Sequence, residues 1–139
     1  MIYILDTDHV SLLERKVGPE AERLRFRLSR FGKTTTVITF EEQMRGWLSW
    51  ISKARSLAEQ VVRYKKLNQT MDHYREIKVL DFDQAAADEF ERLQKQRIRI
   101  GTMDLKIAAI ALANDATLLS RNVQHFGQVP GLKLEDWSK

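Results

Sequence analysis

The stretch Ile2-Tyr3-Ile4-Leu5-Asp6 decides the fold class of this chain. Four apolar or aromatic residues that favour β-structure follow one another without a break and end at a carboxylate. A short apolar run of this kind is typical of a strand that is buried on both faces of a sheet. Similar runs predict further strands at 34–39, 77–80, 116–119 and 132–134.

The segments between these runs have the spacing of helices. A helix is expected from about His9, with Thr7 or Asp8 as its cap, and Pro19 suits the first position of the next one. Residues 40–74 are predicted to form one long helix or two successive helices. The apolar residues expected on the inner face of that segment are Trp47, Leu48, Ile51, Leu57, Val61, Tyr64 and Leu67.

Two more helices are expected, one from Phe82-Asp83 and one from Gly101-Thr102. Short apolar strands that alternate with helices favour a parallel sheet covered by helices on both faces. We therefore predict a single α/β domain with a central, mainly parallel sheet of four to five strands.

Composition excludes several classes of protein. The 139 residues contain no cysteine, so thiolate metal sites, thiol nucleophiles and disulfide frameworks are ruled out. No apolar run approaches the ~20 residues that cross a bilayer, and the N-terminal sequence does not resemble a secretion signal. The glycine-rich loops that bind nucleotide phosphates are also missing. We expect a cytoplasmic protein that does not bind a membrane.

The positive charge of the chain is unevenly distributed. The net charge is +4, yet residues 45–78 carry eight basic residues against three acidic ones. A second basic group consists of Arg23, Arg25, Arg27, Arg30 and Lys33. Such clusters are typical either of a phosphate-binding surface or of a solvated helix face, and the sequence leaves both open.

Three acids lie where predicted strands end or the following helices begin. Asp6 directly follows the first predicted strand. Glu42 lies in the first helical turn after the second predicted strand, and Asp104 lies in the first turn of the helix that leads into the fourth. Ligands of open α/β sheets bind beyond the carboxyl ends of the strands. We therefore expect these acids and Asn122, which follows the fourth strand, to converge. Their oxygen atoms suit Mg²⁺ or Mn²⁺, and a cation would offset the repulsion between the carboxylates.

Two of these acids also have a structural explanation. Thr39 and Glu42 have the spacing of a capping box, in which the acid returns a hydrogen bond to the cap backbone. Asp104 comes two residues after a plausible Thr102 cap, where the helix dipole favours an acid. Asp6 has no evident structural role, because packing gives no reason for a carboxylate at the end of an apolar strand.

Other candidate ligands are not decided by the pattern. The acids Asp8 and Glu41 are adjacent to the candidates and stay open as alternatives. The histidines, which are His9, His73 and His125, are too scattered to form a metal-binding spacing without cysteine. Structural or surface roles are expected for all three.

The motifs and their order resemble those of PIN domains, and of VapC toxins in particular. Ile-Tyr-Ile-Leu-Asp-Thr-Asp at 2–8 resembles the opening strand and first acid of that family. Val-Ile-Thr-Phe-Glu-Glu-Gln-Met-Arg-Gly at 37–46 is similar to the second motif, whose acid lies four residues before a glycine and so corresponds to Glu42. Ile-Gly-Thr-Met-Asp at 100–104 resembles the third motif, and Ala-Thr-Leu-Leu-Ser-Arg-Asn-Val-Gln-His-Phe at 116–126 the C-terminal one.

The resemblance implies a PIN-like three-layer α/β/α domain over residues 1–139. The implied activity is that of a Mg²⁺- or Mn²⁺-dependent endoribonuclease, the toxin of a toxin–antitoxin pair, which cuts structured RNA such as tRNA and leaves 5′-phosphate and 3′-hydroxyl ends. Asp6, Glu42 and Asp104 would bind the metal, and Asn122 would complete the catalytic set. The implied partners are RNA, a VapB-type antitoxin and a second copy of the chain in a homodimer.

Two other functions stay open on the pattern. Residues 6–10, Asp-Thr-Asp-His-Val, fit the signature of haloacid-dehalogenase-like phosphatases, but only 19 residues follow Ser120, too few for the remaining motifs of that fold. The second is a non-catalytic PIN-like module that binds RNA or a partner. Asn122 and His125 stand where the family often has acids, and an uncharged Asn122 favours one metal ion over two.

Overall fold

Short parallel strands form the centre of the structure, a computed structural model that describes residues 1–15 and 17–139. In the described residues they are β1 (Tyr3–Leu5), β2 (Thr34–Thr36), β3 (Lys78–Leu80), β4 (Thr117–Leu119) and β5 (Lys133–Glu135). β4 pairs with β1 and β5, whereas β2 pairs with β3. β2 lies beside β1, where the Thr35 hydroxyl donates to the Leu5 carbonyl oxygen (2.6 Å). The strand order is thus β3-β2-β1-β4-β5.

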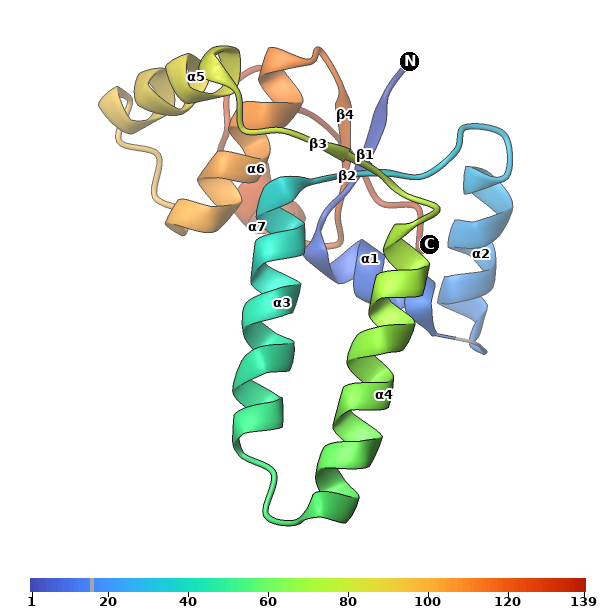
Figure 1. The fold of residues 1–139 in the computed structure, drawn as a ribbon. Helices are drawn as coiled ribbons and strands as arrows, with labels where there is room; N and C mark the ends of the chain where they lie inside the picture. The colour runs from blue at the N-terminus through green and yellow to red at the C-terminus, as the bar shows by residue number, and fades with distance from the viewer. Residues whose placement is uncertain (16) are drawn as a thin grey trace.

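Helices connect the strands and cover them. They are α1 (Thr7–Glu14), α2 (Pro19–Leu28), α3 (Val37–Ser52), α4 (Leu57–Tyr74), α5 (Gln84–Lys95), α6 (Thr102–Ala113) and the single turn α7 (Val123–Phe126). Figure 1 shows α5 and α6 on one side of the strands and α2 on the other. The α/β class and the parallel sheet predicted from the sequence are confirmed, and 40–74 contains two successive helices.

The alternation of side chains along β1 and β4 builds a core on each face of the sheet. Ile4 and Leu118 belong to the core made with α5 and α6, whereas Leu5 and Leu119 belong to the core made with α1 and α2. All four side chains are fully buried. This is the expected result for strands of a parallel sheet, which are covered on both faces and therefore apolar at every position.

The predicted strand at 34–39 is half as long as expected. It ends at Thr36, whose hydroxyl oxygen accepts a hydrogen bond from the backbone N–H of Thr39 (3.1 Å), so that α3 begins at Val37. Residues 37–39 are β-branched and favoured a strand, but this N-cap starts the helix within the β-branched run. The capping box predicted for Thr39 and Glu42 is therefore wrong, because Thr36 is the cap.

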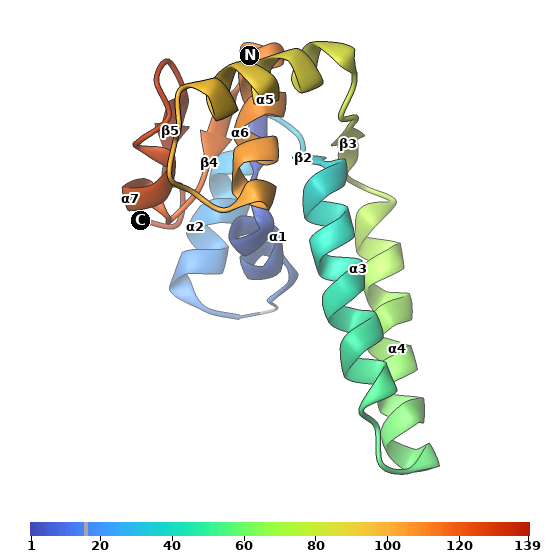
Figure 2. The same cartoon turned by 90° about the vertical axis from the view of Figure 1, so that its left-hand side faces the viewer.

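α3 and α4 form a hairpin that extends away from the strands (Figure 2). Trp47, Ile51 and Leu67 are partly buried as predicted. The prediction of an inner face is wrong for Leu48, Leu57, Val61 and Tyr64, which are 60%, 78%, 70% and 55% exposed. The physical reason is that this length of hairpin lies beyond the sheet, so each helix has only the other to pack against. No helix in the described residues is long and apolar enough to cross a membrane.

Leu118 lies at the centre of the sheet, so its truncation tests this architecture. Leu118→Ala should lower the free energy of unfolding by about 2–5 kcal/mol, because it removes buried methyl groups and leaves a cavity. Gln94→Ala on the exposed side of α5 should change it by less than about 0.5 kcal/mol. Urea denaturation followed by circular dichroism measures both. Equal effects of the two substitutions would contradict the burial described here.

Candidate metal centre

Asp6 stands where β1 ends and α1 begins. Its backbone N–H donates to the Leu119 carbonyl oxygen (3.1 Å), which continues the pairing of β1 with β4. Its side-chain Oδ1 accepts a hydrogen bond from the backbone N–H of His9 (2.7 Å) and caps α1. Asp6 is 5% exposed. Two expectations were wrong here, because Asp6 itself replaces Thr7 or Asp8 as the cap and so has a structural role in addition to any chemical one.

Glu42 lies in the second turn of α3 and faces the start of α1. The Thr7 hydroxyl donates a hydrogen bond to Glu42 Oε1 (2.8 Å), and the Thr39 hydroxyl oxygen lies 3.3 Å from that of Thr7. These contacts join two helices whose first residues follow neighbouring strands. Glu42 is thus held beside Asp6 by tertiary contacts, and not by the helix cap that its spacing indicated.

Asp104 is the third residue of α6. The cap of this helix is Gly101, which offers no side-chain hydrogen bond, and Thr102 is already the first helical residue. The predicted Thr102 cap is therefore wrong. An acid in the first turn interacts favourably with the helix dipole. Asp104 is partly buried and faces other carboxylates, which a helix end alone does not require.

The three predicted acids influence one another electrostatically. Burial raises the pKa of Glu42, and the charges of Asp104 and Asp6 raise it further, against the effect of the Thr7 hydrogen bond. Burial also raises the pKa of Asp104, with a further contribution from Asp6. The carboxylates therefore share one region in which negative charge is unfavourable. Hard carboxylate oxygens in such a region are the donor set that a divalent cation such as Mg²⁺ or Mn²⁺ fits.

The ligand atoms that lie closest together belong to another group. Among the described residues, Asp6, Asp8 and His9 each offer an atom within 4.8 Å of the others, whereas Asp6, Glu42 and Asp104 are not gathered as tightly. Asp6, Asp8 and His9 are close because they belong to the same first turn of α1 and its cap. Glu42 and Asp104 come from other helices, and their charges and that of Asp6 disfavour one another in this region.

Arg121 forms a salt bridge with the carboxylate of Asp8. Its Nε and Nη2 donate to the two Asp8 oxygens (2.6 and 2.8 Å), and it also pairs with Glu20. The hydrogen bonds from Arg121 lower the pKa of Asp8. The other alternative acid, Glu41, pairs with Arg45 one turn along α3. Both acids left open by the sequence thus have a cationic partner, which favours Asp6 and Glu42 as the acids available to a metal.

His9 packs against Asp6 and is fully buried. Its Nδ1 lies 3.4 Å from Asp6 Oδ1 and its Nε2 lies 3.7 Å from Asp136 Oδ1, and neither nitrogen forms a hydrogen bond within the described part of the chain. Asp136 Oδ1 accepts hydrogen bonds from Ser138. His9 is buried, but the structural role expected for it stays a prediction, because it also belongs to the group with Asp6 and Asp8 whose ligand atoms lie closest together.

Asn122 and His125 lie together after β4. The Asn122 backbone N–H donates to the Ser120 hydroxyl oxygen (2.9 Å), and the Asn122 side-chain nitrogen lies 3.1 Å from His125 Nδ1. The charge of His125 lowers the pKa of Asp104, which places this pair near the acidic cluster. His125 is exposed, which agrees with the surface role expected for it, and its contact with Asn122 was not predicted, although the two residues are three positions apart at the start of α7.

Comparison with known proteins agrees with this architecture. The profile of the PIN domain matches residues 3–132. The chain is 28% identical to the tRNA(fMet)-specific endonuclease VapC of Salmonella typhimurium over 97% of both proteins. It is 43% identical to ribonuclease VapC2 of Rickettsia felis over 47 residues, which span only 35% of that protein. The solved structure of VapBC2 from Rickettsia felis, bound to a promoter DNA fragment, matches with a TM-score of 0.74 and 25% identity over 99% of both chains.

A profile that covers nearly the whole chain defines its family. This protein belongs to the PIN domain family. Its curated relatives are VapC ribonucleases, and its structural neighbours include complexes of VapB with VapC. The family predicted from the sequence motifs is therefore confirmed.

The structural role of Asp6 can be tested separately from its charge, because the N-cap needs only a hydrogen-bond acceptor. Asn caps a helix as well as Asp does, whereas Ala does not. Asp6→Asn should therefore keep the stability of the metal-free protein within about 0.5 kcal/mol, and Asp6→Ala should lower it by about 1 kcal/mol. Chemical denaturation in the presence of a chelator measures both values. Equal stability of the two variants would contradict the capping hydrogen bond.

The raised pKa of Glu42 has a consequence for stability. Since the folded protein holds this proton more tightly than the unfolded chain, the free energy of unfolding falls as pH rises from the ordinary carboxyl value of 4.5 through the raised pKa. Glu42→Gln removes the charge and keeps an acceptor for Thr7. We expect it to raise the melting temperature of the metal-free protein near neutral pH, and the difference from wild type should shrink in acid.

Glu41→Gln is the matched control for this measurement. It removes the neighbouring charge and a favourable pair with Arg45, so it should leave the stability unchanged or slightly lower it. Thermal melts of both variants with a chelator, at about pH 4 and about pH 7, give the comparison. A melting temperature of Glu42→Gln below that of Glu41→Gln at neutral pH would contradict repulsion within the cluster.

Proposed function

We propose that this protein is a divalent-metal-dependent endoribonuclease, the toxin of a VapBC-type pair, whose catalytic residues are Asp6, Glu42, Asp104 and Asn122. The observation that carries the proposal is the group of three carboxylates from the end of β1, from α3 and from the start of α6, two of them with raised pKa values. Full-length similarity to VapC ribonucleases supports the reaction class. We extend the proposal to a single PIN domain over residues 1–139.

The residues have distinct roles in this proposal. Mg²⁺ or Mn²⁺, when bound, supplies Lewis-acid polarisation of a phosphodiester and an activated water. Asp6 and Asp104 offer ligand oxygens from two rigid supports, a capped strand end and the first turn of a helix. Glu42, oriented by Thr7, offers a third oxygen or holds the attacking water. Asn122 offers an amide oxygen without charge, which favours a single ion.

The RNA backbone has a basic surface available on the α3–α4 hairpin. The basic segment 45–78 corresponds to this hairpin and the start of β3. In the described part of the chain, five of its cations form no salt bridge: Lys53, Arg55, Lys65, Lys66 and Lys78. Cations of this kind bind phosphates, and binding of RNA should weaken steeply with salt. The RNA is proposed to be structured, such as the tRNA cut by the Salmonella relative.

Protein partners are also part of the proposal. The structural neighbours are complexes of VapB with VapC, which supports a VapB-type antitoxin as a partner of this chain. The exposed apolar side chains of the hairpin support a protein interface on the same element. We assign that interface to a homodimer, since paired copies would cover side chains that α3 and α4 cannot cover for each other.

Substitution of the cluster tests the reaction. Asp6→Asn and Asp104→Asn should each slow Mn²⁺-dependent cleavage of labelled RNA by about a hundredfold or more, because even partners outside the ligand set are typically worth about 10–100-fold. Glu41→Gln, next to the cluster, should cleave at the wild-type rate. Denaturing gels with and without a chelator give the rates. RNA that is bound but never shortened by wild-type protein with Mg²⁺ or Mn²⁺ would instead favour a non-catalytic binding module.

A further inference from the structure

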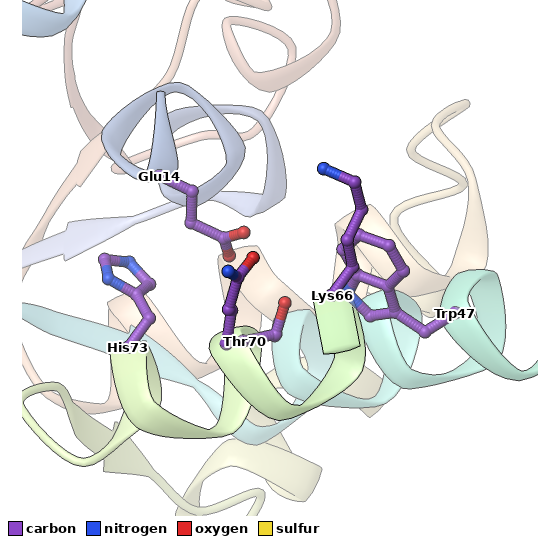
Figure 3. Close-up of a pocket in the computed structure, with 6 residues that line it drawn as sticks. Glu14, Trp47, Lys66, Thr70 and His73 are labelled. Carbon is purple, nitrogen blue, oxygen red and sulfur yellow. The ribbon is translucent and has the colours of Figure 1, made fainter. Parts of the chain in front are cut away.

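A cavity of about 650 Å³ lies between α1 and the α3–α4 hairpin. Its walls come from three helices and consist of Glu14, Trp47, Lys66, Gln69, Thr70 and His73. Figure 3 shows Glu14 projecting from α1 toward α4, with His73 on the facing side and Lys66 and Trp47 at the other end. None of these residues belongs to the proposed catalytic set.

The cavity lies along the same pair of helices that holds the metal centre. Thr7, Ser11 and Glu14 follow one face of α1, where they meet Glu42 and Gln43 of α3. A second hollow of about 400 Å³ shares Glu14 and Trp47 with the cavity and is also lined by Ser11 and Gln43. At a helical rise of about 1.5 Å per residue, Glu14 lies about 10 Å along α1 from Thr7. The cavity is therefore near enough to the proposed metal centre for a nucleotide beside the cleaved bond to enter it.

The polar groups of the cavity have unused hydrogen-bonding capacity. Gln43 approaches Glu14 Oε1 at a long 3.5 Å. Burial raises the pKa of Glu14, so N–H donors that replace lost water would stabilise its charged form. Nε2 of His73 is buried and has no hydrogen-bond partner among residues 1–15 and 17–139. A buried polar atom without a partner is costly, so a ligand that pairs with it gains affinity.

The remaining walls suit a planar aromatic ligand attached to an anion. Trp47 is partly buried and offers an indole ring, on which bases of single-stranded RNA stack. Lys66 is exposed at the same cavity and has no acidic partner in the described chain, so its charge is free for a phosphate. An aromatic ring, a carboxylate with a single long hydrogen bond, a buried imidazole nitrogen without a partner and a cation together match a nucleotide better than an apolar peptide side chain.

We propose that this cavity is a nucleobase subsite for a nucleotide adjacent to the cleaved bond of the RNA substrate. The base stacks on Trp47, its hydrogen-bonding edge meets Glu14 and His73, and Lys66 pairs with the attached phosphate. Guanine fits best, because its N1–H and N2–H donors lie side by side and can both reach one carboxylate. The subsite rests on the proposed ribonuclease function, but its binding can be measured without cleavage.

Mononucleotide binding is the first test. The indole N–H signal of Trp47, assigned by its loss in Trp47→Phe, is followed by NMR while the metal-free protein is titrated with GMP, AMP, CMP or UMP. GMP is expected to shift this signal at the lowest concentration, and Glu14→Gln should weaken GMP binding by about tenfold while UMP binding changes little. A Trp47 signal that no nucleotide shifts would overturn the subsite and favour a protein segment as its occupant.

Cleavage of a random-sequence RNA pool is the second test. Sequencing of the product ends from wild-type protein should give a preference for guanine next to the cut, and Glu14→Gln should flatten it. Trp47→Ala should raise KM by about 5- to 100-fold with kcat nearly unchanged, and Trp47→Phe should restore part of the loss because it keeps an aromatic face. Gln94→Ala, on the exposed side of α5 and outside the hairpin, is the control and should match wild type.

The two tests separate the subsite from the proposed function. Wild-type protein that cuts no RNA in Mg²⁺ or Mn²⁺ contradicts the ribonuclease, and the mononucleotide titration still decides whether the cavity binds a base. Wild-type protein that cuts RNA with the same end preference and KM as Glu14→Gln and Trp47→Ala overturns the subsite alone. Melting temperatures of the variants within a few degrees of wild type show that each one is folded.

Discussion

The backbone hydrogen bond from Asp6 to Leu119 lies at the end of the β1–β4 pairing, and the site is built outward from it. The two strands send Ile4 and Leu118 into one core and Leu5 and Leu119 into the other, so their register is fixed by two cores at once. That register sets Asp6 at the same edge as the segment after β4, which carries Asn122. The parallel pairing of β1 with β4 thus places Asp6 and Asn122, which are distant in sequence, at the same edge of the sheet.

The contact between α1 and α3 is the second constraint, and it positions residues both at the acidic cluster and at the cavity. At the strand ends, the hydrogen bond from Thr7 to Glu42 holds an acid beside Asp6. Further along, Gln43 contacts Ser11 and Glu14 and accepts a hydrogen bond from the Tyr74 hydroxyl, which ties α4 to the same pair. The acids Asp6 and Glu42 and the cavity therefore lie at two ends of one helix–helix contact. A change in its geometry would affect both.

The sequence predicted elements better than their ends. Each strand lies within a predicted run, and the signal is strongest for β1 and β4, where Ile4, Leu5, Leu118 and Leu119 are fully buried. Caps were harder: α3 begins inside a β-branched run because Thr36 caps it, and α1 is capped by Asp6. The inner face of the hairpin was also overestimated, because apolar spacing does not reveal that Leu57 and Val61 lie beyond the sheet. Each miss depends on what surrounds the residue in space.

What the sequence by itself determined was the family, the parallel α/β class and the set of acids that follow the strands, since these depend on local composition and order. The tertiary structure decided which acids are free. Asp8 is neutralised by Arg121, which is 113 residues away, whereas Glu42 faces Asp6 and Asp104 without a cation. It also decided that Glu14, Trp47 and His73 share a cavity. Salt bridges and cavities of this kind arise from contacts between segments that are distant in sequence, so residue spacing along the chain does not predict them.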